Sequence, residues 1–378
     1  MKDEKETKNG DTYQFQIGTH ETSDEVFNRI NRIYQKAKND EPEIFKDNIN
    51  LNSKIMYRLA EHLQELHINK IDLDTKGIAF ELFMQDFFKG KNGQYFTPRN
   101  IVKFCIELTD PQIHHIILDP ACGSGGFLLH SLDHIREFTE KNYDEKEAWQ
   151  HWHNFAMNNL YGIEINAGIA RVCKMNMIIH DDGHTNVINA DALKKFLDIC
   201  SIHKRFEKDS FDLILTNPPF GASVKNSEVD YMEDYEFGKN NKGKTRKTQK
   251  TETLFIERCI DYVKSGTGII SMVLPDGVLT NATLQYVRNY LMGRCQILAI
   301  VSLPDFAFTH YGAGVKSSIV LLRKKNYDEK NTEYPIFMSI AEHIGYDSTG
   351  RDDPLNDLDL IIKEYEKFKK DPSNYKGK

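Results

Sequence analysis

A chain of 378 residues, 40% of them apolar and 28% charged, has the composition of a globular protein that can bury one large core and a smaller accessory domain. Its net charge of −7 argues against a surface that binds nucleic acid everywhere, because phosphate binding depends on lysines and arginines. No run of about 18 apolar residues occurs, so we expect a cytoplasmic protein without a membrane segment. The six widely spaced cysteines predict neither a metal site nor a disulfide framework.

Helical spacing of apolar residues characterises the N-terminal part of the chain. Three such patterns predict helices over about 23–39, 53–66 and 77–88, and Ser23 is the expected cap of the first. From residue 115 onward, short apolar runs alternate with helical patterns. These runs lie at 116–118, 160–165, 187–188, 211–215, 268–274, 297–303 and 319–322. The alternation predicts an α/β fold with a doubly wound, mostly parallel sheet.

These changes of pattern divide the chain into three parts. We expect a helical N-terminal domain over residues 1–90, a catalytic domain over 91–346, and a charged tail with a short helix over 347–378. A polar segment, 221–250, interrupts the catalytic domain, with acidic residues in its first half and basic residues in its second. We interpret this segment as a long mobile loop.

A glycine-rich turn follows the first predicted strand, at the kind of position where doubly wound sheets bind ligands. The turn begins at Asp119 and contains Gly123, Ser124, Gly125 and Gly126. Leu128 stands where a dinucleotide-binding motif requires its third glycine, which disfavours a nicotinamide cofactor. Asp119 suits a ligand with a cationic amino group. The structural alternative is a tight turn with a capping aspartate.

The second and third predicted strands also end in acidic residues. Glu164 lies where nucleotide-binding α/β folds bind ribose hydroxyls, although its distance of 45 residues from Asp119 exceeds the usual separation of about 20. An insertion around 142–159 accounts for the difference. Asp191 could accept the exocyclic amine of an adenine ring. The alternatives are a surface acid for Glu164 and a helix cap for Asp191.

The fourth predicted strand ends in Asn217, Pro218, Pro219 and Phe220. The two prolines stiffen the loop, so the Asn217 side chain and the Pro218 carbonyl are two fixed acceptors. An aromatic amine that donates both N–H groups to acceptors is drawn toward tetrahedral geometry, and its lone pair can then attack a sulfonium methyl group. Phe220 offers a ring on which a flipped base can stack. A simple turn is the alternative.

A further candidate segment precedes the predicted helix at 101–108. It comprises Gln94, Tyr95, Phe96, Thr97 and Pro98. A proline at the first helical position leaves N–H groups free for an anion such as an amino-acid carboxylate. The alternative is that Thr97 only caps the helix.

In combination, these motifs resemble those of the γ-class amino-methyltransferases of DNA, most closely the modification subunit of type I restriction-modification systems. The resemblance covers about residues 24–368. It implies a seven-stranded, Rossmann-like sheet that binds S-adenosylmethionine and ends in an antiparallel hairpin, and a site-specific enzyme that methylates adenine N6. It also implies that residues 95–98 hold the methionine end, Asp119 and the 123–126 turn the amino-acid moiety, Glu164 the ribose, Asp191 the adenine amine, and residues 217–220 the target base.

The resemblance also implies the partners. The substrate is double-stranded DNA with a flipped adenine. After Arg323 only about 55 residues remain, too few for a recognition domain of roughly 100 residues. We therefore expect a separate specificity subunit, docked on the N-terminal helices and the tail, and a restriction subunit as an optional further partner. The basic residues in 239–250 either close over DNA phosphates or belong to a solvated linker.

Three alternatives stay open. The chain could be a stand-alone or fused γ-class adenine methyltransferase of another restriction or defence system. The Asn-Pro-Pro-aromatic loop also occurs in methyltransferases of protein glutamine and of ribosomal RNA guanine. A non-catalytic scaffold that binds the cofactor is the third. Cytosine C5 chemistry is disfavoured, because it needs a cysteine nucleophile that usually follows a proline, and the chain has no Pro-Cys pair.

Overall fold

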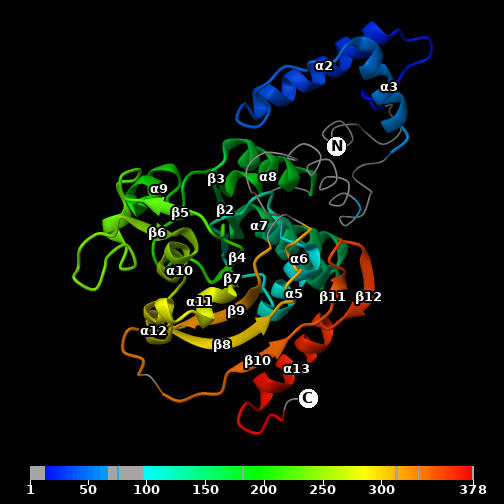
Figure 1. Cartoon of the computed structure of the whole chain (residues 1–378). Helices are drawn as coiled ribbons and strands as arrows, with labels where there is room; N and C mark the ends of the chain where they lie inside the picture. The colour runs from blue at the N-terminus through cyan, green and yellow to red at the C-terminus, as the bar shows by residue number, and fades with distance from the viewer. Residues whose placement is uncertain are drawn as a thin grey trace. The chain divides into compact units, whose positions relative to one another are not determined.

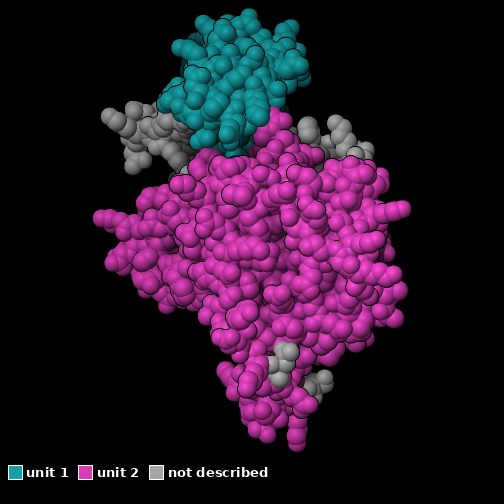
Figure 2. Space-filling view, turned by 90° about the vertical axis from the view of Figure 1, so that its left-hand side faces the viewer, with its two compact units in different colours: residues 1–89, 174–180 teal, residues 90–173, 181–378 magenta. Residues whose placement is uncertain are grey.

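The computed structural model describes residues 13–66, 75, 97–180, 183–310, 314–330 and 332–376 (Figure 1). The chain divides into two compact units, which Figure 2 colours separately: residues 1–89 with 174–180, and residues 90–173 with 181–378. The helix predicted over 77–88 lies outside the described residues. Our division into three domains stays a proposal.

The described part of the first unit contains two amphipathic helices, α2 (Ser23–Asp40) and α3 (Ser53–Leu63). Thr22 caps α2, one residue before the expected Ser23: its Oγ1 accepts a hydrogen bond from the Glu25 N–H, and the Glu25 carboxylate accepts one from the Thr22 N–H. Such a capping box satisfies two helix-terminal donors reciprocally. The two helices pack through the buried side chains of Val26, Ile30, Met56 and Ala60.

An eight-stranded sheet forms the centre of the second unit, in the order β10-β8-β9-β7-β4-β1-β2-β3. The strands are β1 (Ile117–Asp119), β2 (Leu160–Glu164), β3 (Val187–Asn189), β4 (Leu213–Thr216), β7 (Ile269–Pro275), β8 (Cys295–Ser302), β9 (Ser317–Lys324) and β10 (Phe337–Ile340). Neighbouring strands are parallel except at β9, which is antiparallel to both β7 and β8. The mostly parallel sheet and its antiparallel hairpin are thus confirmed.

The sheet has one strand more than the seven that the resemblance implies. The additional strand, β10, is at the edge of the sheet and pairs in parallel with β8. Of its apolar residues only Phe337 is buried, whereas Met338 and Ile340 are 72% and 71% exposed. A four-residue edge strand with one buried apolar side chain leaves no clear periodicity in the sequence, so we did not predict it.

Helices cover both faces of the sheet, as expected for a doubly wound fold. Figure 1 shows α5, α6, α7 and α13 on one side and α10, α11 and α12 on the other. The helices are α5 (Arg99–Thr109), α6 (Gly126–Asn142), α7 (Glu145–Asn159), α8 (Ala167–Ile179), α9 (Phe196–Ile202), α10 (Thr251–Tyr262), α11 (Asp276–Thr280), α12 (Gln285–Arg294) and α13 (Leu358–Lys370), with 3-10 turns at His184–Asn186, Met232–Asp234 and Ala282–Leu284. The helix α7 is the predicted insertion between Asp119 and Glu164. No helix in the described ranges is long and apolar enough to span a bilayer.

The prediction of a long mobile loop over 221–250 is wrong. Two strands of this segment, β5 (Ser223–Lys225) and β6 (Thr248–Lys250), pair antiparallel. Between them lie four buried apolar side chains, Tyr231, Met232, Tyr235 and Phe237. Burial of these side chains stabilises an ordered conformation of the segment in spite of its polar composition. We call residues 221–250 the insertion. A second antiparallel pair, β11 (Ile344–Tyr346) and β12 (Asp352–Asn356), precedes α13.

The helix α10 anchors the insertion through two charged residues. The Glu257 carboxylate accepts the backbone N–H groups of Glu236 and Phe237 at 2.7 and 2.9 Å. Arg258, which is 3% exposed, donates to the Tyr235 hydroxyl and to the Leu193 carbonyl. These bonds hold the middle of the insertion against α10, because buried charge-assisted hydrogen bonds are strong.

Candidate active site

Four neighbouring parallel strands bring the predicted motifs together. Since β4, β1, β2 and β3 are adjacent and point the same way, the turns that follow them meet at one edge of the sheet. A cavity of about 460 Å³ opens there, within the usual size range of small-molecule sites. Of the predicted site residues, its lining includes Gly123, Glu164, Asp191, Asn217, Pro218, Pro219 and Phe220.

Asp119 lies at the end of β1 and is 2% exposed, next to the cavity residues Pro120 and Ala121. Its Oδ1 accepts the Thr216 hydroxyl at 2.8 Å and the Ala121 N–H at 3.0 Å. Burial nevertheless raises the pKa of this carboxyl to about 7, since two neutral donors do not replace its lost hydration. A cation beside it would return the pKa toward the ordinary range.

Glu164 joins the first two strand ends. Its Oε2 accepts the Gly123 N–H at 3.1 Å and its Oε1 accepts the Asn166 N–H at 2.8 Å. Burial raises the pKa of this carboxyl, and the two N–H groups oppose the change. Gly123 has a φ of +53° and no heavy atom within 4 Å of where a Cβ would lie, so the turn leaves open space beside the carboxylate.

Asp191 is held by two donors from different parts of the chain. Its Oδ1 accepts the Leu193 N–H at 2.9 Å, as in a local turn, and its Oδ2 accepts the Tyr231 hydroxyl at 2.9 Å. Burial raises the pKa of Tyr231, so this phenol remains a protonated donor. The insertion thereby supplies a partner for the acidic residue that follows β3.

Asn217 follows β4 directly, and its amide is oriented by a residue far away in the sequence. The Nδ2 donates to Thr97 Oγ1 at 3.0 Å, whereas Oδ1 is buried and has no hydrogen-bond partner. In this orientation of the amide, the Thr97 hydroxyl is the acceptor for Nδ2. Asn217 therefore presents an acceptor with unused capacity in the cavity wall.

Phe220 is held beside the same cavity by a second aromatic ring. Its centroid lies 6.3 Å from that of Phe308 at an interplanar angle of 90°, an edge-to-face contact. Both rings line the cavity, Phe220 from the turn after β4 and Phe308 from the turn after β8. This side of the cavity therefore has aromatic walls.

Some predicted residues lie elsewhere. Ser124 and Gly125 directly precede α6, Gly126 is its first residue, and none of the three lines the cavity. Pro98 is the residue before α5 rather than its first helical residue. Thr97 does not cap α5 but binds Asn217. The remaining residues of that segment, Gln94, Tyr95 and Phe96, lie outside the described residues.

The sequence analysis missed three residues of the site, Thr216, Tyr231 and Phe308. Thr216 directly precedes Asn217 and ends β4, the strand beside β1, which ends in Asp119. A threonine at the end of one predicted strand and an aspartate at the end of another could have suggested the hydrogen bond between them. Tyr231 belongs to a set of aromatic residues in an otherwise acidic stretch, a signal of burial. Phe308 gave no such signal, because its approach to Phe220 depends on the sheet order.

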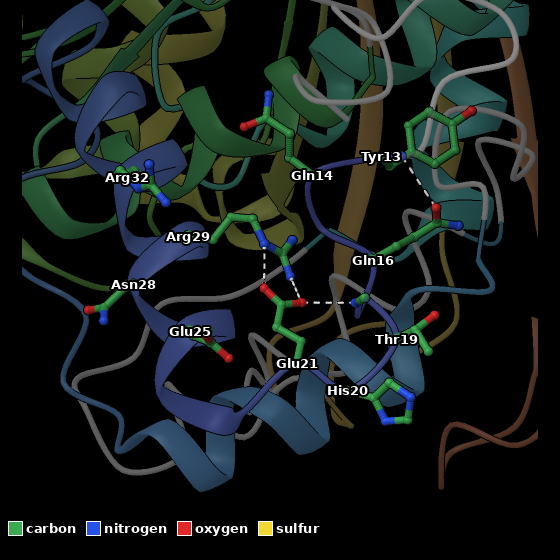
Figure 3. A pocket seen from close by; sticks show the side chains of 11 residues that line it. Tyr13, Gln14, Gln16, Thr19, His20, Glu21, Glu25, Asn28, Arg29 and Arg32 are labelled. Carbon is green, nitrogen blue, oxygen red and sulfur yellow. Dashed lines mark hydrogen bonds and ion pairs between the residues drawn. The ribbon is translucent and has the colours of Figure 1, made fainter.

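The first unit contains a separate, open hollow of about 760 Å³, shown in Figure 3. It is lined by residues between Tyr13 and Arg32. The guanidinium of Arg29 forms two hydrogen bonds with the carboxylate of Glu21, at 2.9 and 2.5 Å, which neutralises its charge. None of the motifs discussed above contributes to this hollow.

The fold and the cavity define a Rossmann-like α/β protein with a nucleotide-sized site at the carboxyl ends of its strands. The chain belongs to the N-6 DNA methylase family, whose model matches residues 71–376. The predicted family is thus confirmed.

Individual relatives agree with this membership. The chain is 28% identical over 266 residues to the type I restriction enzyme EcoEI methylase subunit of Escherichia coli, covering 68% of this chain and 49% of that protein. It is 28% identical over 248 residues to the EcoKI methylase subunit of Escherichia coli K12, covering 65% and 43%. The chain thus spans about half the length of the curated relatives that it matches.

A solved structure shows the same fold. The type I restriction-modification system methyltransferase subunit from Streptococcus thermophilus superposes with a TM-score of 0.65 at 19% identity, covering 92% of this chain and 70% of that one.

Proposed function

We propose that this chain acts as a site-specific DNA methyltransferase that transfers a methyl group from S-adenosylmethionine to the N6 amine of adenine. The observation on which the proposal depends is the buried Oδ1 of Asn217, an acceptor with no partner in the wall of a nucleotide-sized cavity. An unsatisfied buried acceptor costs about 1–3 kcal/mol, so a donor on a bound substrate would be favoured there. Membership of the N-6 DNA methylase family supports an amine as that donor.

The cavity fits the proposed cofactor. Asp119 can pair with the ammonium group, and Glu164, beside the open space at Gly123, can accept ribose hydroxyls through its remaining lone pairs. Asp191 can accept the adenine amine, and apolar side chains are available for the adenine ring. These side chains are Ile163, Ile165, Ile169, Ala190 and Leu193. The turn at 124–126 and the segment 94–98 stay our candidates for binding the methionine end.

S-adenosylmethionine supplies an electrophilic methyl group when it is bound. Asn217 Oδ1 and the Pro218 carbonyl accept the two N–H groups of the target amine, which localises its lone pair and stabilises the positive charge that develops during attack. The hydrogen bond from Nδ2 to Thr97 leaves Oδ1 available for the amine of the substrate. The ring of Phe220, held by Phe308, stacks on the base.

The proposed biological setting follows the named relatives, which are subunits of type I restriction enzymes. We expect the chain to act in the cytoplasm on double-stranded DNA from which the adenine is flipped. A specificity subunit would read the sequence, and a restriction subunit could join. The chain's net charge of −7 supports shared DNA recognition, because phosphate binding depends on lysines and arginines.

The test compares three proteins in the complex in which they occur. Asn217→Ala should lower kcat by about 100- to 1000-fold, as removal of one preorganised electrostatic group does elsewhere, with the Kd for S-adenosylmethionine unchanged. Thr97→Val keeps Oδ1 but removes the partner that orients it, so an intermediate loss is expected. Methyl transfer from labelled cofactor and calorimetric cofactor binding are the measurements. A fully active Asn217→Ala enzyme would refute the proposal.

A further inference from the structure

The second half of the insertion is the most basic exposed stretch of an acidic chain. Six of the twelve residues over 239–250 are lysine or arginine, and none is acidic. The residues are Lys239, Lys242, Lys244, Arg246, Lys247 and Lys250. A chain of net charge −7 gains nothing in solubility from such a cluster, so a local partner of negative charge is indicated.

The structure holds this stretch as a hairpin. The Asn240 N–H donates to the Lys244 carbonyl at 2.9 Å, and Lys239 and Thr245 form an antiparallel β-bridge. The Arg246 guanidinium lies 5.1 Å from the centre of the Tyr286 ring and donates to the Lys239 carbonyl. We call residues 239–247 the basic hairpin. Its conformation is set by hydrogen bonds and ring contacts rather than by ion pairs.

The charges of the basic hairpin are not neutralised by the protein. Throughout the described part of the chain, no carboxylate forms an ion pair with Lys239, Lys242, Lys244 or Lys247, all of which are exposed. Two acidic residues of the insertion pair with other residues instead. Glu228 binds Lys225 at 2.8 Å, and Glu236 lies 3.7 Å from Arg294.

The base of the insertion is tied to the active-site loop. The Lys250 ammonium donates to the Gly221 carbonyl at 2.9 Å, directly after Phe220, and the Thr251 N–H donates to the Ala222 carbonyl at 3.2 Å. At about 3.3 Å per residue, the paired residues from Lys250 back to Lys247 extend about 10 Å from that base. Phosphates follow one another every 3.4 Å of axis along each strand of DNA, so phosphates near a flipped nucleotide lie within reach of Lys247, with which the basic hairpin ends.

We propose that the basic hairpin binds the phosphates of duplex DNA beside the flipped adenine, through Lys239, Lys242, Lys244 and Lys247. The inference rests on the proposed function, because a base can enter the cavity only if its strand passes the loop to which the hairpin is tied. The hairpin reads no sequence: lysine contacts to phosphate position the duplex, whereas base contacts specify it.

The experiment measures the affinity of the full chain for a 30-base-pair duplex with one central mismatched adenine, by fluorescence anisotropy between 50 and 200 mM salt. In the quadruple variant, with lysine replaced by glutamine at 239, 242, 244 and 247, the slope of log K against log salt should decrease by about 3.6, which corresponds to four phosphate contacts. The wild type should therefore lose about 100-fold more affinity than the variant across this salt range.

A matched control replaces the four lysines of α13 by glutamine, at 363, 367, 369 and 370, which changes the net charge equally. Its slope should stay that of the wild type. The double variant Lys242→Gln/Lys244→Gln, at the hairpin turn, should lose about 1.8 of the slope even if the quadruple variant folds poorly. An equal loss in hairpin and α13 variants, or no loss in either, would overturn the proposal.

The two proposals fail in different ways. If the wild type methylates adenine but the hairpin variants keep the full salt slope, only the hairpin proposal is wrong. If the hairpin controls the salt slope but no DNA is methylated by the wild-type complex, the hairpin binds duplex DNA, but the proposed function, and with it the place beside a flipped adenine, is wrong.

Discussion

Replacing Asp119 by asparagine should stabilise the ligand-free protein while it weakens cofactor binding. The carboxyl is 2% exposed, and burial raises its pKa from 3.8 to about 7. The amide keeps an oxygen acceptor for the Thr216 hydroxyl and the Ala121 N–H but never becomes charged. It also cannot form an ion pair with an ammonium group, so affinity for S-adenosylmethionine should fall.

The sign and the size of the stability effect follow from the pKa. Because the folded protein binds this proton more tightly than the unfolded chain does, the contribution of Asp119 is fully present below pH 3.8, decreases as the pH rises, and is lost above about pH 7. A difference of about three pKa units corresponds to about 4 kcal/mol, at about 1.4 kcal/mol for each. Asp119→Asn should thus gain up to about 4 kcal/mol at pH 8 and little at pH 4.

Chemical denaturation of both proteins from pH 4 to pH 8 measures this difference in the free energy of unfolding. Asp328→Asn, on an exposed segment, controls for the change in net charge. The difference between Asp119→Asn and wild type should grow with pH and level off near pH 7. If the free energy of unfolding has the same pH dependence in the two proteins, the reasoning that burial raises the pKa of Asp119 is refuted.

The acidic residues of the other strand ends give two further predictions. Glu164→Ala should raise the Kd for S-adenosylmethionine, and unchanged calorimetric binding would remove Glu164 from the site. Tyr231→Phe removes only the hydroxyl that orients Asp191 and should weaken cofactor binding by about tenfold, the effect of one hydrogen bond to a charged group. If Tyr231→Phe binds the cofactor like the wild type, the insertion does not contribute to the cofactor site.

The parts of the fold that the sequence predicted are those determined by local patterns. Alternating apolar runs and helices identified the parallel strands, and each of the first four runs ended in residues whose chemistry suited one ligand group. Because neighbouring parallel strands end at the same edge of the sheet, the sequence alone predicts that Glu164, Asp191 and Asn217 lie together.

The parts that could not be predicted depend on contacts between distant segments. The insertion looked like a loop because its polar composition conceals four buried apolar residues, whose environment is created by α10. The bond from Asn217 to Thr97 spans 120 residues, and that from Tyr231 to Asp191 spans 40. Neither bond leaves a periodic signal in the sequence. Only the folded chain therefore shows that the acceptor of the Asn217 side chain, Oδ1, is unused.

The most direct test of the account is to identify the methylated base in host DNA with and without the gene. We expect that deletion removes N6-methyladenine from one defined sequence, that the wild-type gene restores it, and that the Asn217→Ala gene does not. An unchanged set of N6-methyladenine sites after deletion, or the loss of a different modified base, would contradict the account.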